Sequence, residues 1–349
     1  MAESMIKTAT SAVRIIREHF NKDFDLLILY VTDLCNAKCD HCFYSKSLNK
    51  NRQMSLEDIG KISSKLPAFR SLNLTGGEPF LRKDIAEIAR MFYRDNQVRD
   101  IWIPSNGIID PSPRVLEMLQ SCPELSVTVN FSIDDLREKH DLIRGVPCFD
   151  KAVENSKNLM ALKMRYPNLK DRLRICVNTV IHSQNFSGME SISLFIKTLG
   201  VDYHSFELMR GDPKNPKLRP LTPEEFKEYQ RISIETETHY MTYSRLGSWY
   251  AKRYREMFYK NQEHSLKGEP WNTDCTAGIT SAVIYADGEV GVCELLGPIG
   301  NIKDNGHDLP AMLGSEKAMK LKKFIKDTRC RCTHCVFLSN TMRHSLKCL

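Results

Sequence analysis

The sequence contains no apolar run that approaches the roughly 18 residues needed to span a membrane. Its first twenty residues lack both a continuous apolar core and a small-residue cleavage site, which excludes a secretory signal. No internal repeat or low-complexity tract is present, which excludes a repeat architecture. The charge excess is small, with 50 basic against 43 acidic residues, and suits anionic substrates or weak nucleic-acid attraction without requiring either. We expect a cytoplasmic protein that binds neither membranes nor nucleic acid.

Cysteine, by contrast, is abundant, with twelve residues in a chain of 349. Without export, these cysteines do not fit a disulfide framework, because a reducing compartment keeps thiols free. Ligation of a metal or of a cluster is the better hypothesis. The length allows one large domain and one small one.

Six apolar or β-branched runs alternate with helical patterns. The predicted strands are 25–33, 71–77, 100–107, 126–134, 173–181 and 201–209, and clear helical stretches are 55–66, 149–164 and 186–200. Ser55 with Asp58 marks a helix start, and Gly200 marks a helix end. Strand alternating with helix predicts parallel βαβ units, and the fold class is therefore α/β, a partial (βα)6 TIM-like barrel.

The chain divides into four predicted parts. An N-terminal helical extension (1–24) precedes the core barrel (25–210), and a proline-rich linker with a polar helical region (211–270) follows it. Residues 271–349 hold six of the twelve cysteines and form a small cysteine-rich module containing a β-hairpin.

Cys35, Cys39 and Cys42 follow the first predicted strand, at the mouth of the barrel. Three thiolates in a compact loop can hold three irons of a [4Fe–4S] cluster and leave the fourth iron open for another ligand. The alternative is a zinc loop, but a structural zinc site prefers four protein ligands and only His41 is available locally.

This cysteine spacing resembles the signature of the radical SAM superfamily, and the resemblance extends over residues 25 to 210. It implies that the open iron binds the amino and carboxylate groups of S-adenosylmethionine, whose reductive cleavage gives a 5′-deoxyadenosyl radical. The residue before the third cysteine is usually aromatic in the family, and His41 stands there in this chain. An imidazole can still stack on adenine.

The resemblance also assigns residues at the other strand ends. Gly76, Gly77 and Glu78 would form the site of the methionine amine, although "GGEP" alone could be a tight turn. Ser132 and Asp134 would bind the ribose, with strand capping by Asp134 as the alternative. The remaining cofactor candidates are Arg144 for the methionine carboxylate or in a surface ion pair, Asn178 near the adenosyl group, and Asn106, which could be only part of a turn.

Glu207 and Arg210 end the sixth predicted strand and are the catalytic candidates for substrate contact. A salt bridge at the barrel rim is the competing interpretation.

The second cysteine group begins with Cys275 and Cys293, which flank a hairpin signal at Asp287-Gly288. A two-residue turn there would set Ala282 opposite Cys293. The pattern resembles the twitch module, a short form of the SPASM domain, and this implies an auxiliary [4Fe–4S] cluster. Its assigned ligands are Cys275, Cys293, Cys332 and Cys335, with Cys330 and Cys348 as alternates and a zinc ribbon as the rival reading.

The sequence therefore predicts a radical SAM enzyme of oxidoreductase or isomerase type. Its expected cofactors are the cluster that binds S-adenosylmethionine, a second auxiliary [4Fe–4S] cluster and S-adenosylmethionine itself, and its expected electron donor is a flavodoxin or ferredoxin. Only about 24 residues precede the first strand, which is too short for a peptide-docking domain. We therefore expect a small-molecule substrate, a sugar, aminocyclitol or nucleotide-linked sugar, that is oxidised or epimerised. The alternatives are a peptide-modifying maturase and a non-enzymatic iron–sulfur or zinc module.

Overall fold

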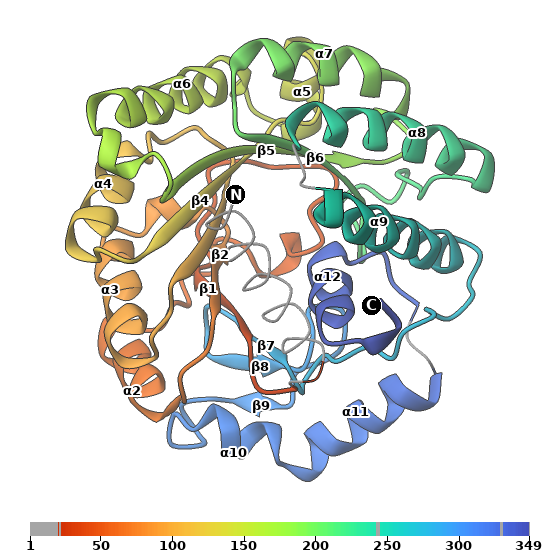
Figure 1. Cartoon of the computed structure of the whole chain (residues 1–349). Coiled ribbons are helices and arrows are strands. Elements are labelled where there is room, and N and C mark those ends of the chain that lie inside the picture. The colour runs from red at the N-terminus through yellow and green to blue at the C-terminus, as the bar shows by residue number, and fades with distance from the viewer. Residues whose placement is uncertain (1–19, 21, 242–244, 329–330, 349) are drawn as a thin grey trace.

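The computed structural model describes residues 20, 22–241, 245–328 and 331–348 and shows a curved sheet lined on its outer side by helices (Figure 1). The sheet has nine strands in the order β6-β5-β4-β3-β2-β1-β7-β8-β9. Its first six strands are parallel and follow the chain order, which confirms the predicted partial barrel. The sheet does not close, since β6 and β9 stand at its two ends.

All six predicted barrel strands are present, each within two residues of its expected bounds. They are β1 (Leu26–Thr32), β2 (Ser71–Gly76), β3 (Asp100–Ser105), β4 (Ser126–Ser132), β5 (Leu173–Ile181) and β6 (Tyr203–Leu208). Strand β1 is buried along its whole length, whereas β3 alternates half-buried and buried residues.

The helices between the strands cover the outside of the barrel (Figure 1). They are α2 (Leu56–Lys65), α3 (Ile85–Asp95), α4 (Ser112–Ser121), α5 (Arg137–Arg144), α6 (Phe149–Arg165) and α7 (Met189–Leu199). Helix α2 begins at the predicted capping box, in which the Asp58 backbone N–H donates to the Ser55 hydroxyl at 3.0 Å. Gly200 ends α7 in the left-handed conformation, as predicted.

The polar helical region consists of two helices, α8 (Pro223–Tyr240) and α9 (Arg245–Leu266). Helix α8 packs on β6, and α9 packs on α12 (Cys335–Arg343) of the cysteine-rich module. In this way the helical region joins the last barrel strand to the module. The helix predicted over 1–24 falls almost entirely outside the described residues.

The cysteine-rich module continues the barrel sheet. Its strand β7 (Ser281–Ile284) pairs in parallel with β1, and β8 (Glu289–Gly291) and β9 (Gly300–Asn301) extend the sheet in antiparallel fashion. Helices α10 (Leu309–Leu313) and α11 (Glu316–Thr328) lie below these strands in Figure 1. Because β7 runs parallel to β1, its hairpin tip lies at the same end of the sheet as the first cysteine loop.

The predicted hairpin is present, but its register is wrong by one residue. Ile284 pairs with Val290 and Val283 with Gly291, so Ala282 is not opposite Cys293. The loop uses three residues, 286–288, because Gly288 takes a positive φ of 93° and accommodates the additional residue. Within the described residues, no helix combines the length and the apolar character that crossing a membrane requires.

Candidate active site

The first cysteine loop leaves β1 and is held in place from two sides. The backbone N–H groups of Lys38 and Asp40 both donate to carbonyls at the end of α5, at 2.9 Å each. The Asn49 side chain accepts from the Cys35 backbone N–H at 2.9 Å. The loop that presents the three thiols is therefore fixed by hydrogen bonds that do not involve the thiols.

Gly76 and Gly77 pack directly against this loop. A Cβ atom on Gly76 would lie 2.3 Å from the Thr32 carbonyl oxygen, and one on Gly77 would lie 2.2 Å from the Leu34 carbonyl oxygen. The Gly77 and Glu78 backbone N–H groups also donate to the carbonyls of Thr32 and Leu34, at 2.9 and 2.8 Å. Any side chain here would displace the cysteine loop, so the two glycines are needed for more than a turn.

The Glu78 carboxylate is buried and ties β2 to β3. It accepts from the Ser105 hydroxyl at 2.9 Å and from the Asn106 backbone N–H at 2.8 Å. Burial raises the pKa of Glu78 to about 7 despite these hydrogen bonds. The Asn106 amide in turn donates to the Asn36 side chain at 2.8 Å, so Asn106 also reaches the cysteine loop.

Arg144 and Asp134 form a buried ion pair behind the cysteine loop. The Arg144 Nε lies 2.7 Å from an Asp134 carboxylate oxygen, and Arg144 also donates to the Cys39 Sγ at 3.5 Å. Only 5% of Arg144 is exposed, which rules out the surface ion pair considered from the sequence. Burial alone would raise the pKa of Asp134, but Arg144 and two neighbouring histidines outweigh it and hold this pKa at about 2.

His41 lies beside this pair, with its Nε2 3.9 Å from the Asp134 carboxylate and its ring 5.9 Å from that of His182. Burial lowers the pKa of His41 to about 4, so the ring is neutral near pH 7. Ser132, the last residue of β4, is the register partner of Asn178 within β5, and the Asn178 amide oxygen accepts from the Ser205 hydroxyl at 3.1 Å. The structure thus brings the predicted cofactor residues to one end of the barrel.

Two of the four assigned thiols of the cysteine-rich module lie beside Trp271. Cys275 and Cys332 pack against the small apolar cluster of Trp271, Leu338 and Met342, and the Trp271 indole N–H donates to the Cys332 carbonyl at 3.1 Å. Cys293 follows the hairpin, and Cys335 begins α12. The two alternate ligands, Cys330 and Cys348, are not placed, because the structure describes neither Cys330 nor the side chain of Cys348.

A buried charge cluster, made of Tyr30, Glu207, Arg210, Glu294 and His334, lies between the barrel and the module. Arg210 donates to Glu207 at 3.4 Å and to Glu294 at 3.2 Å. Glu294 also accepts from the Tyr30 hydroxyl at 2.6 Å and from the His334 ring. The ion pair between Glu207 and Arg210 that the sequence left open is therefore present, as one part of a larger cluster.

Arg210 and His334 set the charge of Glu294. Burial alone would raise the pKa of Glu294, but these two side chains outweigh it and hold the pKa at about 2. The Arg210 guanidinium also lies 4.8 Å from the centre of the Phe43 ring, directly after Cys42. Tyr30, Glu294 and Phe43 were not among the residues predicted from the sequence, and His334 was considered only as a ligand of the alternative zinc ribbon. The available signal for Phe43 and Glu294 was that each directly follows an assigned cysteine ligand.

The ligand spacing favours a cluster over zinc at the first site. Zinc bound by ~2.3 Å bonds would hold its sulfur ligands roughly 3.8 Å apart. Among the described residues, only His140, Asp141 and Cys148 place three such ligand atoms within 4.8 Å of one another, and Cys35, Cys39 and Cys42 do not. A cubane holds its thiolates farther apart, because each binds a different iron. Burial also raises the pKa of Cys35 and of Cys42 to about 11, so these thiols ionise only when they bind a metal cation.

The group of His140, Asp141 and Cys148 is explained by hydrogen bonding within the fold. The His140 Nδ1 accepts from the Asp134 backbone N–H at 3.1 Å, and the Asp141 carboxylate accepts from the Cys148 backbone N–H at 2.8 Å. These contacts brace the loop that carries Asp134.

Comparison with known families decides between the interpretations. The model of the radical SAM superfamily matches residues 29–192, and the SPASM model, an iron–sulfur cluster-binding domain, matches residues 275–336. The chain belongs to the radical SAM superfamily and carries a C-terminal SPASM module. This radical SAM protein therefore uses a [4Fe–4S] cluster with S-adenosylmethionine and an auxiliary iron–sulfur cluster.

Its curated relatives catalyse different reactions. It is 28% identical over 196 residues to a probable GTP 3′,8-cyclase of Sulfurisphaera tokodaii, covering 55% of this chain and 58% of that one. It is 27% identical over 179 residues to an Fe-coproporphyrin III synthase of Methanosarcina barkeri, covering 50% of this chain and 41% of that one. The radical SAM chain thus spans about half the length of the curated relatives that it matches.

Solved structures support the fold over most of the chain. SuiB of Streptococcus suis superposes with a TM-score of 0.62 at 13% identity, covering 95% of this chain and 77% of SuiB. The chain anSMEcpe, solved with bound AdoMet, superposes with a TM-score of 0.59 at 18% identity, covering 85% of this chain and 82% of that one. At these identities the likeness concerns the fold alone.

Proposed function

We propose that this radical SAM enzyme removes a hydrogen atom from a polar small molecule, namely a sugar, an aminocyclitol or a nucleotide-linked sugar, and thereby oxidises or epimerises it. The main support for the proposal is the position of Arg210. Its guanidinium contacts Phe43, which follows a ligand of the first cluster, and Glu294, which follows a ligand of the auxiliary cluster. The space between the two predicted cluster sites is therefore bordered by ionised side chains.

The charge of this border suits a substrate rich in hydrogen-bond donors. Glu207 and Glu294 contribute two carboxylates against one guanidinium, and burial lowers the pKa of His334, which leaves this ring neutral near pH 7. Glu294 already accepts from Tyr30, Arg210 and His334, so Glu207, which is more exposed, is the carboxylate of this border that can accept from a hydroxyl or amino group on the reacting carbon. A carbon carrying such groups is what a sugar or an aminocyclitol offers.

In this proposal the cofactors are held by the residues at the barrel mouth and in the module. Cys35, Cys39 and Cys42 hold the first cluster, the backbone at Gly76 and Gly77 faces the methionine amine, and Ser132 and Asn178 face the ribose. Cys275, Cys293, Cys332 and Cys335 hold the second cluster. When bound, the first cluster and S-adenosylmethionine supply a 5′-deoxyadenosyl radical, and the auxiliary cluster supplies an acceptor for one electron.

Arg144 and Asp134 act together in this site. The Arg144 Nε pairs with the Asp134 carboxylate, and one terminal nitrogen donates to the Cys39 Sγ. The remaining N–H groups of the guanidinium can donate to the methionine carboxylate. The Asp134 side chain is fully buried, and we therefore assign it to positioning Arg144 instead of direct contact with ribose.

Glu207 is the proposed base for the proton of the substrate hydroxyl. Its carboxylate is 19% exposed and lies beside Arg210. Glu207 also neighbours Cys335, and burial, together with this carboxylate, raises the pKa of the Cys335 thiol. In the proposed cluster site Cys335 is a thiolate and cannot donate a hydrogen bond to Glu207. The Glu207 carboxylate oxygen is then available to accept from the substrate.

Anaerobic reconstitution followed by incubation with dithionite and S-adenosylmethionine tests the activity. We expect 5′-deoxyadenosine to accumulate, and the triple replacement of Cys35, Cys39 and Cys42 by Ala to abolish it. Incubation with deuterated sugars and aminocyclitols tests the substrate class, because abstraction carries deuterium into 5′-deoxyadenosine. Deuterium arriving only from a peptide would establish the maturase alternative.

A further inference from the structure

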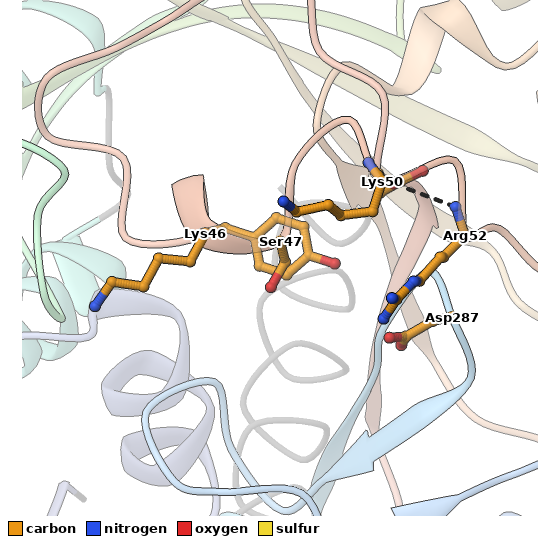
Figure 2. A pocket seen from close by; sticks show the side chains of 7 residues that line it. Lys46, Ser47, Lys50, Arg52 and Asp287 are labelled. Atoms are coloured by element: carbon orange, nitrogen blue, oxygen red, sulfur yellow. Dashed lines mark hydrogen bonds between the residues drawn. The ribbon is translucent and has the colours of Figure 1, made fainter.

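A hollow of about 190 Å³ opens beside the first cysteine loop, between residues 44–52 and the tip of the β7–β8 hairpin (Figure 2). Its lining includes Tyr44, Lys46, Ser47, Lys50 and Arg52 on one segment and Asp287 on the hairpin. None of these residues takes part in the site described above.

A buried carboxylate shapes the basic side of the hollow. Asp33, which is 2% exposed and also lines the hollow, accepts from the backbone N–H groups of Lys50 and Arg52, at 2.7 and 3.3 Å. Asn51 between them adopts a positive φ of 56°. This loop conformation fixes where the two cationic side chains leave the backbone, and Figure 2 shows both beside the hollow.

Three side chains there have donors and no partner. Within the described part of the chain, no ion pair or hydrogen bond engages the side chains of Lys50, Arg52 or Ser47, whereas the Tyr44 hydroxyl is hydrogen-bonded to the Ala286 backbone. Lys46, by contrast, is paired with Asp212 at 2.7 Å. A lysine, a guanidinium and a hydroxyl around one hollow match the several acceptor oxygens of a phosphate group.

The two carboxylates of the lining limit which anion fits. The Asp33 Oδ1 is buried without a hydrogen-bond partner, and Asp287 stands on the hairpin side. A phosphate attached to a hydroxylated carbon skeleton brings hydrogen-bond donors for these carboxylates and should therefore bind more tightly than phosphate or diphosphate alone. Sugar phosphates and nucleotide-linked sugars have this combination.

The hollow also adjoins the buried charge cluster. The Tyr44 ring packs 4.7 Å from the ring of Tyr30, whose hydroxyl donates to Glu294 at 2.6 Å. Tyr44 also stacks on Tyr285 of the hairpin, with ring centres 5.8 Å apart. The rings of Tyr30, Tyr44 and Tyr285 therefore lie between the hollow and the buried charge cluster.

We propose that this hollow binds the phosphate or diphosphate group of the substrate through Lys50 and Arg52. The inference rests on the proposed function and narrows its substrate to a phosphorylated or nucleotide-linked sugar.

Calorimetric titration of the reconstituted enzyme with inorganic diphosphate tests the site. We expect binding in the wild type and at least tenfold weaker binding in the Lys50→Ala/Arg52→Ala variant. The matched control is Lys61→Ala/Arg94→Ala, which removes an exposed lysine of α2 paired with Glu57 and an exposed arginine of α3 paired with Asp95. This control should bind diphosphate like the wild type. Absence of binding to the wild type, or equal affinity in the Lys50/Arg52 variant, would overturn the proposal.

A second measurement separates this site from a docking surface for an acidic electron donor. If the Lys50/Arg52 variant keeps its diphosphate affinity and loses only reduction by a flavodoxin, the proposal is wrong and the cations serve the donor. Formation of 5′-deoxyadenosine with dithionite and without substrate is measured in parallel. Its absence would refute the proposed function, whereas its presence without diphosphate binding would refute only the phosphate site.

Discussion

The guanidinium of Arg210 lies 3.2 Å from the carboxylate of Glu294, and this ion pair joins the end of β6 to the segment that follows Cys293. The Glu294 side chain is only 3% exposed, so its charge is compensated by protein groups instead of water. The geometry of the module relative to the barrel mouth therefore depends on a contact between residues 84 positions apart.

Replacing Arg210 by Ala should destabilise the protein by ~3 kcal/mol, because it leaves a buried carboxylate without its cation. Arg210→Lys should lose less stability, because the positive charge is kept. It loses only the planar guanidinium that donates to Glu207 and Glu294 at the same time. Urea unfolding followed by circular dichroism measures both. Arg231→Ala is the control, because the Arg231 side chain is 49% exposed. Its replacement should change the free energy of unfolding too little to be measured. Equal effects of Arg210→Ala and Arg231→Ala would contradict the role of the buried pair.

Replacing Gly77 by Ala should empty the first cluster site and spare the second. The added Cβ would lie 2.2 Å from the Leu34 carbonyl oxygen and 2.9 Å from the Cys35 Cβ, so the cysteine loop must move. We expect reconstituted iron to fall from about eight to about four atoms per chain, as two cubanes reduced to one require. Iron assay and electron paramagnetic resonance check this. Gly60→Ala, whose Cβ would meet only Met91 at an ordinary 3.8 Å, should retain both clusters.

The auxiliary cysteines should be dispensable for cleavage and required for product. Replacing Cys275 and Cys293 by Ser should leave about four irons per chain and preserve 5′-deoxyadenosine formation, because the first site does not use these residues. Product formation should stop. Cys122→Ser, which alters a buried thiol between α4 and β4, is the control and should keep both activities. Loss of 5′-deoxyadenosine in the double variant would show that the two sites are not independent.

The sequence predicted the elements whose signal is local. Alternating strands and helices, the Ser55 cap and the Gly200 stop are written in neighbouring residues, and all are present. The hairpin register was wrong, because a two-residue and a three-residue turn share the same Asp-Gly signal and differ only in the conformation of Gly288.

The buried charge cluster could not be predicted, because its contacts are distant in the chain. Tyr30 and Glu294 are 264 positions apart, and only the pairing of β7 with β1 brings them together. Sequence periodicity identifies β7 as a strand but does not give its neighbour. The same limit applies to Arg144, which an exposed or a buried partner would fit equally well from sequence, and which proved to be buried against Asp134.

The His204 side chain should make stability depend on pH in the acidic range. It is a fully buried residue of β6, its Nε2 lies 2.9 Å from the hydroxyl of Thr179 on β5, and burial lowers its pKa to about 3. The unfolded chain takes up a proton near pH 6.5 while the folded chain does not, so stability is fully present above pH 6.5 and falls as the pH drops towards 3. The loss attributable to His204 between pH 7 and pH 4 should be about 3 kcal/mol. His204→Gln keeps a hydrogen-bonding side chain and cannot titrate, so the difference in unfolding free energy between wild type and variant should shrink by this amount on acidification. Parallel stability curves for the two proteins would show that His204 becomes protonated in the folded state, because only then would its burial carry no pH-dependent penalty.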